Sequence, residues 1–317
     1  MSDLFKTGRA APRSLAAPRS LAAMNDIFAA GDRFLLHQAR LLERRLFATC
    51  FLGQPAAHVV DALSGYQNDD GGFGHALEPD KRCPASLPID VETAFQALAA
   101  ANIVDPEMIG RACDFLARTA AAAGADGAVP LSFPVIEDFP RAAHWTEWTF
   151  KPGLNPTAGL VGLLYQLGVD HPWRSAGAAY CWHKLESGEL PGDAHALSET
   201  LTFLEHVPDR ERAERHAAAL AATLPDVAMF HLDPDAEGYG LTPLSIAPRA
   251  DSHWRSLFTD AQVDGHLDRL MKAQQQDGGW PITWEPPSEA AVCEWRGVVT
   301  LQALRTLTSY GRITQCG

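Results

Sequence analysis

The chain of 317 residues lacks any apolar run near the roughly 18 residues that a membrane-spanning helix needs, so we expect no integral membrane segment. It also lacks an excess of positive charge, because 26 Lys and Arg face 39 Asp and Glu, a net charge of −13. Such an acidic surface repels phosphate backbones, so we expect no nucleic-acid partner. The six scattered cysteines include no Cys-x-x-Cys pair, which indicates buried thiols in a reducing compartment. We therefore predict a cytoplasmic protein.

Several motifs that bind metals or nucleotides are also missing. No Asp-Asp-x-x-Asp run is present, which argues against magnesium-assisted loss of a diphosphate. No His-Glu-x-x-His motif is present, and the 12 histidines show no metal-ligand spacing. A Gly-x-x-x-x-Gly-Lys nucleotide loop is absent as well. We predict neither a metal nor a cofactor.

Apolar residues recur at helical spacing from residue 25 onward, and few stretches alternate as strands do. The stretch 27–49 is expected to form one long helix. Further helices are predicted near 55–66, 89–102, 106–121, 156–168, 173–186, 193–206, 209–223, 259–275 and 290–309. The fold class is therefore all-α, with about ten to twelve helices. The longest connections, which are candidate functional loops, are 69–88, 124–156, 231–256 and 276–289.

The first 23 residues contain a tandem duplication, Ala-Pro-Arg-Ser-Leu-Ala at 11–16 and again at 17–22. They lack the apolar core of about 7–15 residues that a secretory signal has. We expect a disordered tail over 1–23, one folded domain over 24–317, and Met24 as an alternative start.

An internal repeat is the most informative feature of the sequence. Residues 67–79 and 274–286, which lie 207 positions apart, both read Gln-x-x-Asp-Gly-Gly-aromatic-x-x-x-x-Glu-Pro, and each lies between two predicted helices. Weaker copies occur at 126–130 and 237–240. Repeated helix pairs are typical of helical arrays. The strong copies near both ends predict that the array closes into a ring.

The repeat has a structural interpretation that needs no substrate. Its two glycines permit positive φ and a sharp reversal, and the preceding aspartate can accept hydrogen bonds from turn amides. We therefore assign Gln67, Asp70, Gln274 and Asp277 mainly to scaffolding.

The segments 67–73 and 274–280 resemble the Gln–Trp repeats of squalene-hopene and oxidosqualene cyclases and the Gly-Gly-aromatic turns of protein prenyltransferase β subunits. The wider resemblance is to the prenyltransferase/squalene-cyclase repeat superfamily, which implies a single α/α toroid of inner and outer helices. The Asp-x-Cys zinc pattern of a prenyltransferase β subunit is absent. The resemblance thus implies a terpene cyclase-like enzyme that protonates a hydrophobic, isoprenoid-like alkene and so drives cyclisation, isomerisation or hydration.

The segment Asp90-Val91-Glu92-Thr93 resembles the Asp-x-Asp-Asp-Thr motif of class II terpene cyclases. The resemblance gives Glu92 the place of the proton donor and Asp90 that of the first acid, while Thr93 stands where an aspartate is expected. The alternative is structural. Both acids lie in the first turn of a helix predicted after Pro88, where carboxylates are favoured by the helix dipole and the unpaired amides.

Two glutamates of the repeat, Glu78 and Glu285, occupy equivalent positions, and each precedes a proline. If the loops of a closed ring converge, these carboxylates face a common cavity. An apolar, aromatic-lined cavity raises a carboxyl pKa and so suits a general acid. The alternative is that each caps the next helix.

We expect substrate contacts from His75, Phe73 and Trp280 in the repeats and from Tyr239 and Trp284 in the long loops. Aromatic walls suit an isoprenoid chain, and ring faces stabilise cations.

Two other functions stay open. A carbohydrate-active α/α toroid would use two carboxylates as acid and base in an open, polar groove. A non-catalytic toroid would bind a lipid or a protein partner, with its carboxylates in helix caps and surface ion pairs.

Overall fold

The computed structural model describes residues 21–188 and 191–315, and this part of the chain is all-helical, with isolated bridges but no strand. The predicted all-α class is therefore confirmed. The helices are α1 (Leu21–Gln38), α2 (Leu41–Leu52), α3 (Ala57–Ser64), α4 (Pro88–Ala100), α5 (Pro106–Ala122), α6 (Leu154–Gln166), α7 (Pro172–Glu186), α8 (Ala194–His206), α9 (Arg210–Thr223), α10 (Pro243–Ile246), α11 (Asp260–Lys272) and α12 (Glu289–Ser309). Short 3₁₀ turns lie at Pro134–Asp138, Glu147–Phe150, Leu224–Asp226 and His253–Leu257.

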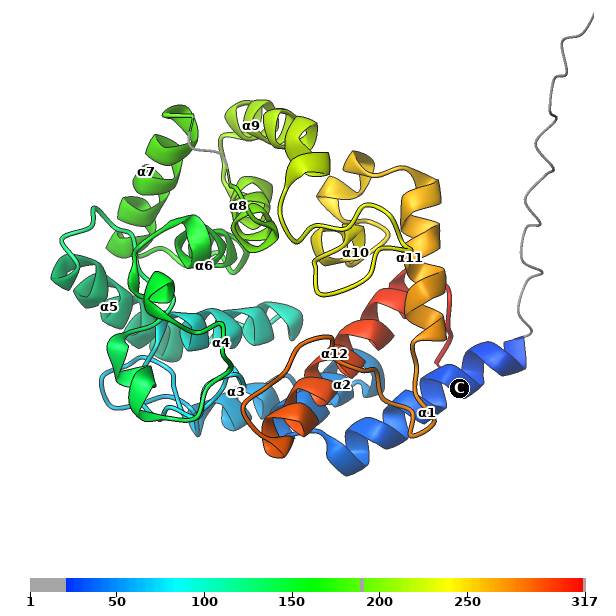
Figure 1. Ribbon diagram of the computed structural model, residues 1–317. Coiled ribbons are helices and arrows are strands. Elements are labelled where there is room, and N and C mark those ends of the chain that lie inside the picture. The colour runs from blue at the N-terminus through cyan, green and yellow to red at the C-terminus, as the bar shows by residue number, and fades with distance from the viewer. Residues whose placement is uncertain (1–20, 189–190, 316–317) are drawn as a thin grey trace, which may run out of the picture.

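The helices are arranged around a ring, with α5, α7, α9 and α11 on its outside and α4, α6 and α8 on its inside (Figure 1). Contacts link α2 to α4, α4 to α6, and α6 to α8. They continue from α8 through α10 and α11 to α12, and α12 contacts α2. The first helix, α1, also packs along the last, α12. This closed circuit is consistent with the expected α/α toroid.

One predicted helix is two helices in the structure. The stretch 27–49 is interrupted between α1 and α2, where Arg40 is extended, with φ of −61° and ψ of 165°. The Arg40 guanidinium is nearly buried, and it donates to the backbone oxygen of Leu77 at 2.8 Å and pairs with Glu43. The break therefore turns the chain so that this cation reaches the loop after α3. A periodic pattern alone does not reveal such a turn.

The predicted tail and the predicted cysteine burial also need correction. Residues 21–23 belong to α1, and the rest of the predicted tail, 1–20, lies outside the described residues. Of the five described cysteines, all free thiols, Cys83, Cys113 and Cys181 are buried as expected. Cys50 on α2 and Cys293 on α12 are exposed.

The first copy of the repeat forms a tight turn after α3. Gly71 has φ of +90°, and the amide of Gly72 donates to the Asp70 carboxylate at 3.0 Å. The Gln67 side-chain amide donates to the backbone oxygens of Gly71 and Met108, both at 2.9 Å. The turn is thereby fastened to the start of the outer helix α5.

The second copy, after α11, forms the same turn. Gly278 has φ of +93°, and the amide of Gly279 donates to Asp277 at 3.1 Å. The Gln274 amide donates to the backbone oxygens of Gly278 and Ile27, both at 2.9 Å. These contacts agree with the scaffolding role assigned from the sequence. Because Ile27 lies on α1, this copy also joins the end of the ring to its beginning.

A large core of buried apolar side chains runs through the helices, and a smaller cluster lies under the long connections. The smaller cluster contains Cys83, Leu87, Leu131, Ile136, Ala142 and Trp145. It packs the loop between α3 and α4 against the loop between α5 and α6. Two backbone hydrogen bonds, Ala142 N to Asp80 O at 2.8 Å and Arg82 N to Pro140 O at 2.9 Å, hold these loops together. Within 21–188 and 191–315, none of the helices combines the length and apolarity that a membrane crossing requires.

Candidate functional site

Side chains from most of the long connections converge on Asp80, which follows the first repeat. Asp80 is buried, and one of its oxygens accepts hydrogen bonds from the indole nitrogens of Trp284 at 3.1 Å and Trp295 at 2.7 Å. Its other oxygen lies 3.3 Å from Nε2 of His144, in the loop between α5 and α6. Over 200 residues of chain separate Asp80 from the two tryptophans, so ring closure is what assembles this group. We call Asp80, His144, Trp284 and Trp295 the Asp80 cluster.

A buried lysine lies directly beside this cluster. Lys81 pairs with Glu78, its ammonium lies 3.9 Å from an Asp90 oxygen, and it lies 4.5 Å from the centre of the Trp145 ring. The backbone amide of Glu78 donates to Asp90 at 2.7 Å. Two of the predicted acids are thus brought together, with a cation between them that the sequence interpretation did not include.

Burial sets the titration of these two acids. It raises the pKa of Glu78 to about 7, although Lys81 acts in the opposite direction. Burial also raises the pKa of Asp90, opposed first by Lys81 and then by the Glu78 amide. One Asp90 oxygen, Oδ2, has no hydrogen-bond partner among the described residues. Lys81 is therefore the main influence that opposes burial at both acids.

Tyr239 and His195 extend the group toward α8. The Tyr239 hydroxyl lies 2.8 Å from His195 Nε2, and the two rings stack with centroids 5.9 Å apart. Tyr239 also meets Trp284 edge to face at 5.7 Å. Burial, followed by the charges of Asp80 and Glu78, raises the pKa of Tyr239 to about 12, and burial lowers the pKa of His195. Both side chains are therefore neutral at pH 7.

A second group of acids lies between the inner helices. Glu92 on α4 is 2% exposed, and its carboxyl group is hydrogen-bonded to that of Glu199 on α8, which is half-buried. Gln96 Nε2 donates to Glu92 at 3.1 Å. Between them, Gly159 on α6 leaves the space that they occupy, since a Cβ there would lie 1.5 Å from a Glu199 oxygen. We call Glu92 and Glu199 the glutamate pair.

Burial raises the pKa of both members of the pair. The pKa of Glu92 lies well above its ordinary value because of burial, with the Glu199 charge acting in the same direction. Burial raises the pKa of Glu199 to about 7, against the lowering effect of the hydrogen bond from Glu92. Both influences favour the protonated form of the Glu92 carboxyl group.

The remaining predicted site residues lie elsewhere. Phe73 is fully buried in the core, and Trp280 is 2% exposed with its indole nitrogen donating to Leu270 O at 2.7 Å, so both pack the scaffold. His75 is exposed and bonds Asn68 at 2.8 Å within its own turn. Glu285 is exposed, so the expected common cavity of Glu78 and Glu285 does not form. After the aromatic residue the two backbones differ, because His75 and Ala76 have positive φ and the equivalent Ile282 and Thr283 do not.

Sequence reasoning missed Asp80, His144, His195 and Glu199. Asp80 has no signal in the repeat, because the equivalent residue of the second copy is Pro287. His195 and Glu199 are four residues apart and therefore share one face of α8. That spacing, on a helix that was predicted correctly, is the one signal that could have found them.

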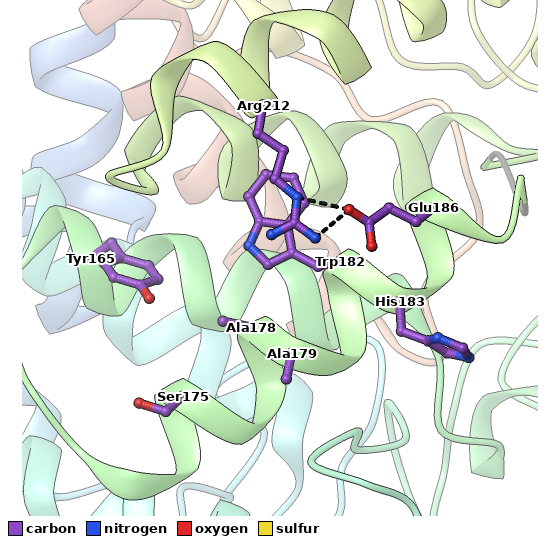
Figure 2. Close-up of a pocket in the computed structure, with 8 residues that line it drawn as sticks. All are labelled: Tyr165, Ser175, Ala178, Ala179, Trp182, His183, Glu186 and Arg212. Carbon is purple, nitrogen blue, oxygen red and sulfur yellow. Dashed lines mark hydrogen bonds and ion pairs between the residues drawn. The ribbon is translucent and has the colours of Figure 1, made fainter.

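Two surface pockets lie away from these groups. One, of about 510 Å³, is bounded by α6, α7 and α9, with Tyr165 on one side and Trp182 on the other (Figure 2). The Arg212 guanidinium lies 4.0 Å from the centre of the Trp182 ring and bonds Glu186 (Figure 2). The other, of about 430 Å³, is bounded by α5 and the following loop. None of the residues that line either pocket belongs to the Asp80 cluster or the glutamate pair.

Among the described residues, no group of three or more His, Cys, Asp or Glu side chains has the arrangement of a metal site. The acids of the site are instead bound to Lys81, to indole nitrogens or to each other. What this arrangement offers chemically is a buried carboxyl group, Glu92, whose protonated form burial favours, beside Glu199, with His195 one helical turn before Glu199 on α8. No protein-family model matches the chain, and no curated protein matches its sequence.

Proposed function

We propose that the protein is a terpene cyclase-like enzyme that protonates the double bond of a hydrophobic, isoprenoid-like substrate. The observation that carries the proposal is the buried carboxyl group of Glu92, whose protonated form burial favours. Protonation of an alkene needs an acid that still holds its proton when the substrate binds, and burial favours the protonated form of a carboxyl group.

The aromatic side chains support the same chemistry. Trp284, Trp295 and Tyr239 pack edge to face beside Asp80, with ring centroids 5.0 and 5.7 Å apart. Ring faces attract cations, so they lower the energy of a carbocation formed from the substrate. Tyr239 is connected through His195 to α8, and Glu199 lies one turn further along the same helix face. The aromatic group and the glutamate pair therefore both have a member on the same face of α8 or bound to it.

The other acids have supporting roles. Glu78 and Asp90 neutralise Lys81 and fix the loop that carries Asp80, so they position the aromatic group rather than donate the proton. Glu285 is exposed and takes no part.

The test is incubation of the purified protein with a panel of prenyl substrates in D₂O, with product analysis by mass spectrometry. We expect product that carries deuterium at carbon, and a loss of about 100-fold or more in turnover for Glu92→Gln, the size typical of general-acid catalysis. Glu285→Gln is the matched control and should keep full activity. Turnover that survives in Glu92→Gln, or no turnover with any prenyl substrate, would contradict the proposal.

A carbohydrate-active toroid is the second candidate, and the polar character of the Asp80 cluster favours it. A carboxylate, two imidazoles and a phenol lie beside indole rings there, a combination suited to sugar hydroxyls and ring faces. The glutamate pair does not fit this reaction, because glycosidase carboxyls lie about 5–10 Å apart whereas these are directly hydrogen-bonded. Oligosaccharide cleavage that is lost in Asp80→Asn and kept in Glu92→Gln would establish this function instead.

A further inference from the structure

We propose that the Asp80 cluster binds the ammonium group of a small alkylamine, which displaces the His144 imidazole from the Asp80 carboxylate. This site goes beyond the proposed function, because neither alkene protonation nor glycoside cleavage requires an amine. The ligand class follows from the ion pairing of Asp80, the charges of the surrounding loops and the exposed ring of Tyr239.

Asp80 is a buried acid that no lysine or arginine neutralises. It is 4% exposed, and among the described residues His144 is the only side chain that approaches it as an ion-pair partner. Lys81 and Arg82, the next residues of the chain, pair with glutamates instead. Buried carboxylates are normally paired, because removing an isolated charge from water is costly. A cationic ligand would supply the partner that the chain does not.

The two oxygens of the Asp80 carboxylate have different surroundings. Oδ1 accepts hydrogen bonds from the indole nitrogens of Trp284 and Trp295. In the part of the chain that the structure describes, no group donates a hydrogen bond to Oδ2, and His144 Nε2 lies 3.3 Å from it. The indoles therefore orient the carboxylate, and Oδ2 can still accept an N–H donor.

His144 is the outermost group on this carboxylate. Its side chain is 51% exposed, whereas that of Asp80 is 5% exposed. The Trp148 indole donates to the backbone oxygen of His144 at 2.8 Å, so it holds the loop and leaves the imidazole able to turn. Exposed side chains change rotamer within nanoseconds. Rotation of His144 therefore opens Oδ2 to a ligand without disturbing the buried contacts.

The loops around the cluster favour a positively charged ligand. Residues 224–242, which include Tyr239, contain no Lys or Arg, and neither do residues 273–288, which include Trp284. Both stretches contain Asp and Glu. A surface of one sign attracts ligands of the opposite sign and repels those of its own. The charge thus selects an amine over a carboxylate or a phosphate.

The aromatic rings beside Asp80 suit the hydrocarbon part of such an amine. Tyr239 is 37% exposed, and it meets Trp284 edge to face at 5.7 Å. Ring faces attract ammonium groups and provide apolar surface for an alkyl chain. Because Oδ2 needs an N–H donor, a primary ammonium fits this place better than a quaternary one.

The first test compares three probes on the purified, full-length protein by calorimetry and tryptophan fluorescence. Hexylammonium has a charge and N–H donors, hexyltrimethylammonium has a charge and no N–H donor, and hexanol has no charge. We expect hexylammonium to bind about 10-fold or more tightly than either of the others, the size of a charge-assisted hydrogen bond. No binding of hexylammonium, or equal binding of all three probes, would overturn the proposal.

The second test locates the site with three variants. Asp80→Asn should weaken hexylammonium binding about 10-fold or more, because it removes the charge that faces the ammonium group. His144→Ala should bind hexylammonium at least as tightly as the unaltered protein, because the group to be displaced is gone. The control Glu285→Gln should change binding by no more than about twofold, since solvent ions screen a single exposed charge.

Unchanged binding in Asp80→Asn would overturn the proposal, and weaker binding in His144→Ala would overturn the displacement of His144. If circular dichroism shows that Asp80→Asn does not fold, the three probes and His144→Ala still decide. Binding is measured without turnover, so these outcomes are separate from those of the prenyl-substrate assay.

Discussion

The two copies of the Gln-x-x-Asp-Gly-Gly repeat have the same geometry up to the aromatic residue and different surroundings after it. Both glycine turns have φ near +90°, and both glutamines bond a turn oxygen and an oxygen on an outer helix. Beyond the aromatic residue, Glu78 is buried against Lys81, whereas Glu285 is exposed. The repeated residues therefore encode the turn, and the chemistry of the site comes from residues that are not repeated.

The largest difference between the copies should appear when their glutamates are changed. Glu78→Gln leaves the buried Lys81 with only the Asp90 carboxylate, 3.9 Å away, so we expect a loss of about 3–5 kcal/mol in the free energy of unfolding. Glu285→Gln, at an exposed position, should change it by less than about 0.5 kcal/mol. Denaturant unfolding of both variants measures the contrast. Equal effects would show that the copies are equivalent beyond the turn.

Substitution of the turn glycines should cause a smaller loss in the free energy of unfolding, equal in the two copies. A Cβ on Gly71 would lie 2.4 Å from Arg111 O, and one on Gly278 would lie 2.2 Å from Ala30 O. Both positions have positive φ, so we expect Gly71→Ala and Gly278→Ala each to cost about 2–4 kcal/mol.

The matched control for these turns is Gly110→Ala, on α5, where a Cβ meets nothing within 4 Å. Because alanine favours the helix, this variant should be stabilised by up to about 1 kcal/mol. Thermal unfolding of the three variants is the measurement. If the Gly→Ala substitution lowered stability in one copy and not in the other, the two repeats would not be structurally equivalent.

The smallest change in stability is expected from an ion pair that the second copy has and the first copy lacks. Arg296 donates to both oxygens of Asp277 at 2.8 Å, whereas Asp70, at the equivalent place, accepts from the Ser86 hydroxyl. The Asp277 carboxylate is half exposed, so Arg296→Met should cost only about 1 kcal/mol or less. The difference should shrink in high salt, because ions screen an exposed pair. A salt-independent loss would attribute the effect to the packing of Arg296 over Phe34 instead.

The sequence was sufficient for the all-α fold class because the signals that mark helices are local. Helix α5 runs from Pro106 to Ala122 against a prediction of 106–121, since a proline and a capping aspartate mark its start and apolar periodicity its extent. The break at Arg40 was not predictable, because it depends on a contact with Leu77, far away in the chain.

The site was only partly predictable for the same reason. Glu92, Asp90 and Glu78 were found through motifs, and Tyr239 and Trp284 through their loops. Their partners carry no local signature: Glu199 matters only because α8 packs against α6 at a glycine, and Asp80 only because ring closure brings two tryptophans to it. The spacing of residues along the sequence cannot predict contacts that form only when distant segments pack together.

The contact of α1 with α12 has a consequence for how the protein is made. During synthesis α1 leaves the ribosome long before α12, so its α12-facing surface stays uncovered until α12 has been made. Gln274 reaches Ile27 only at that late moment, and Trp295 reaches Asp80 later still. The newborn protein is therefore an open arc in which the Asp80 cluster is incomplete until α12 arrives.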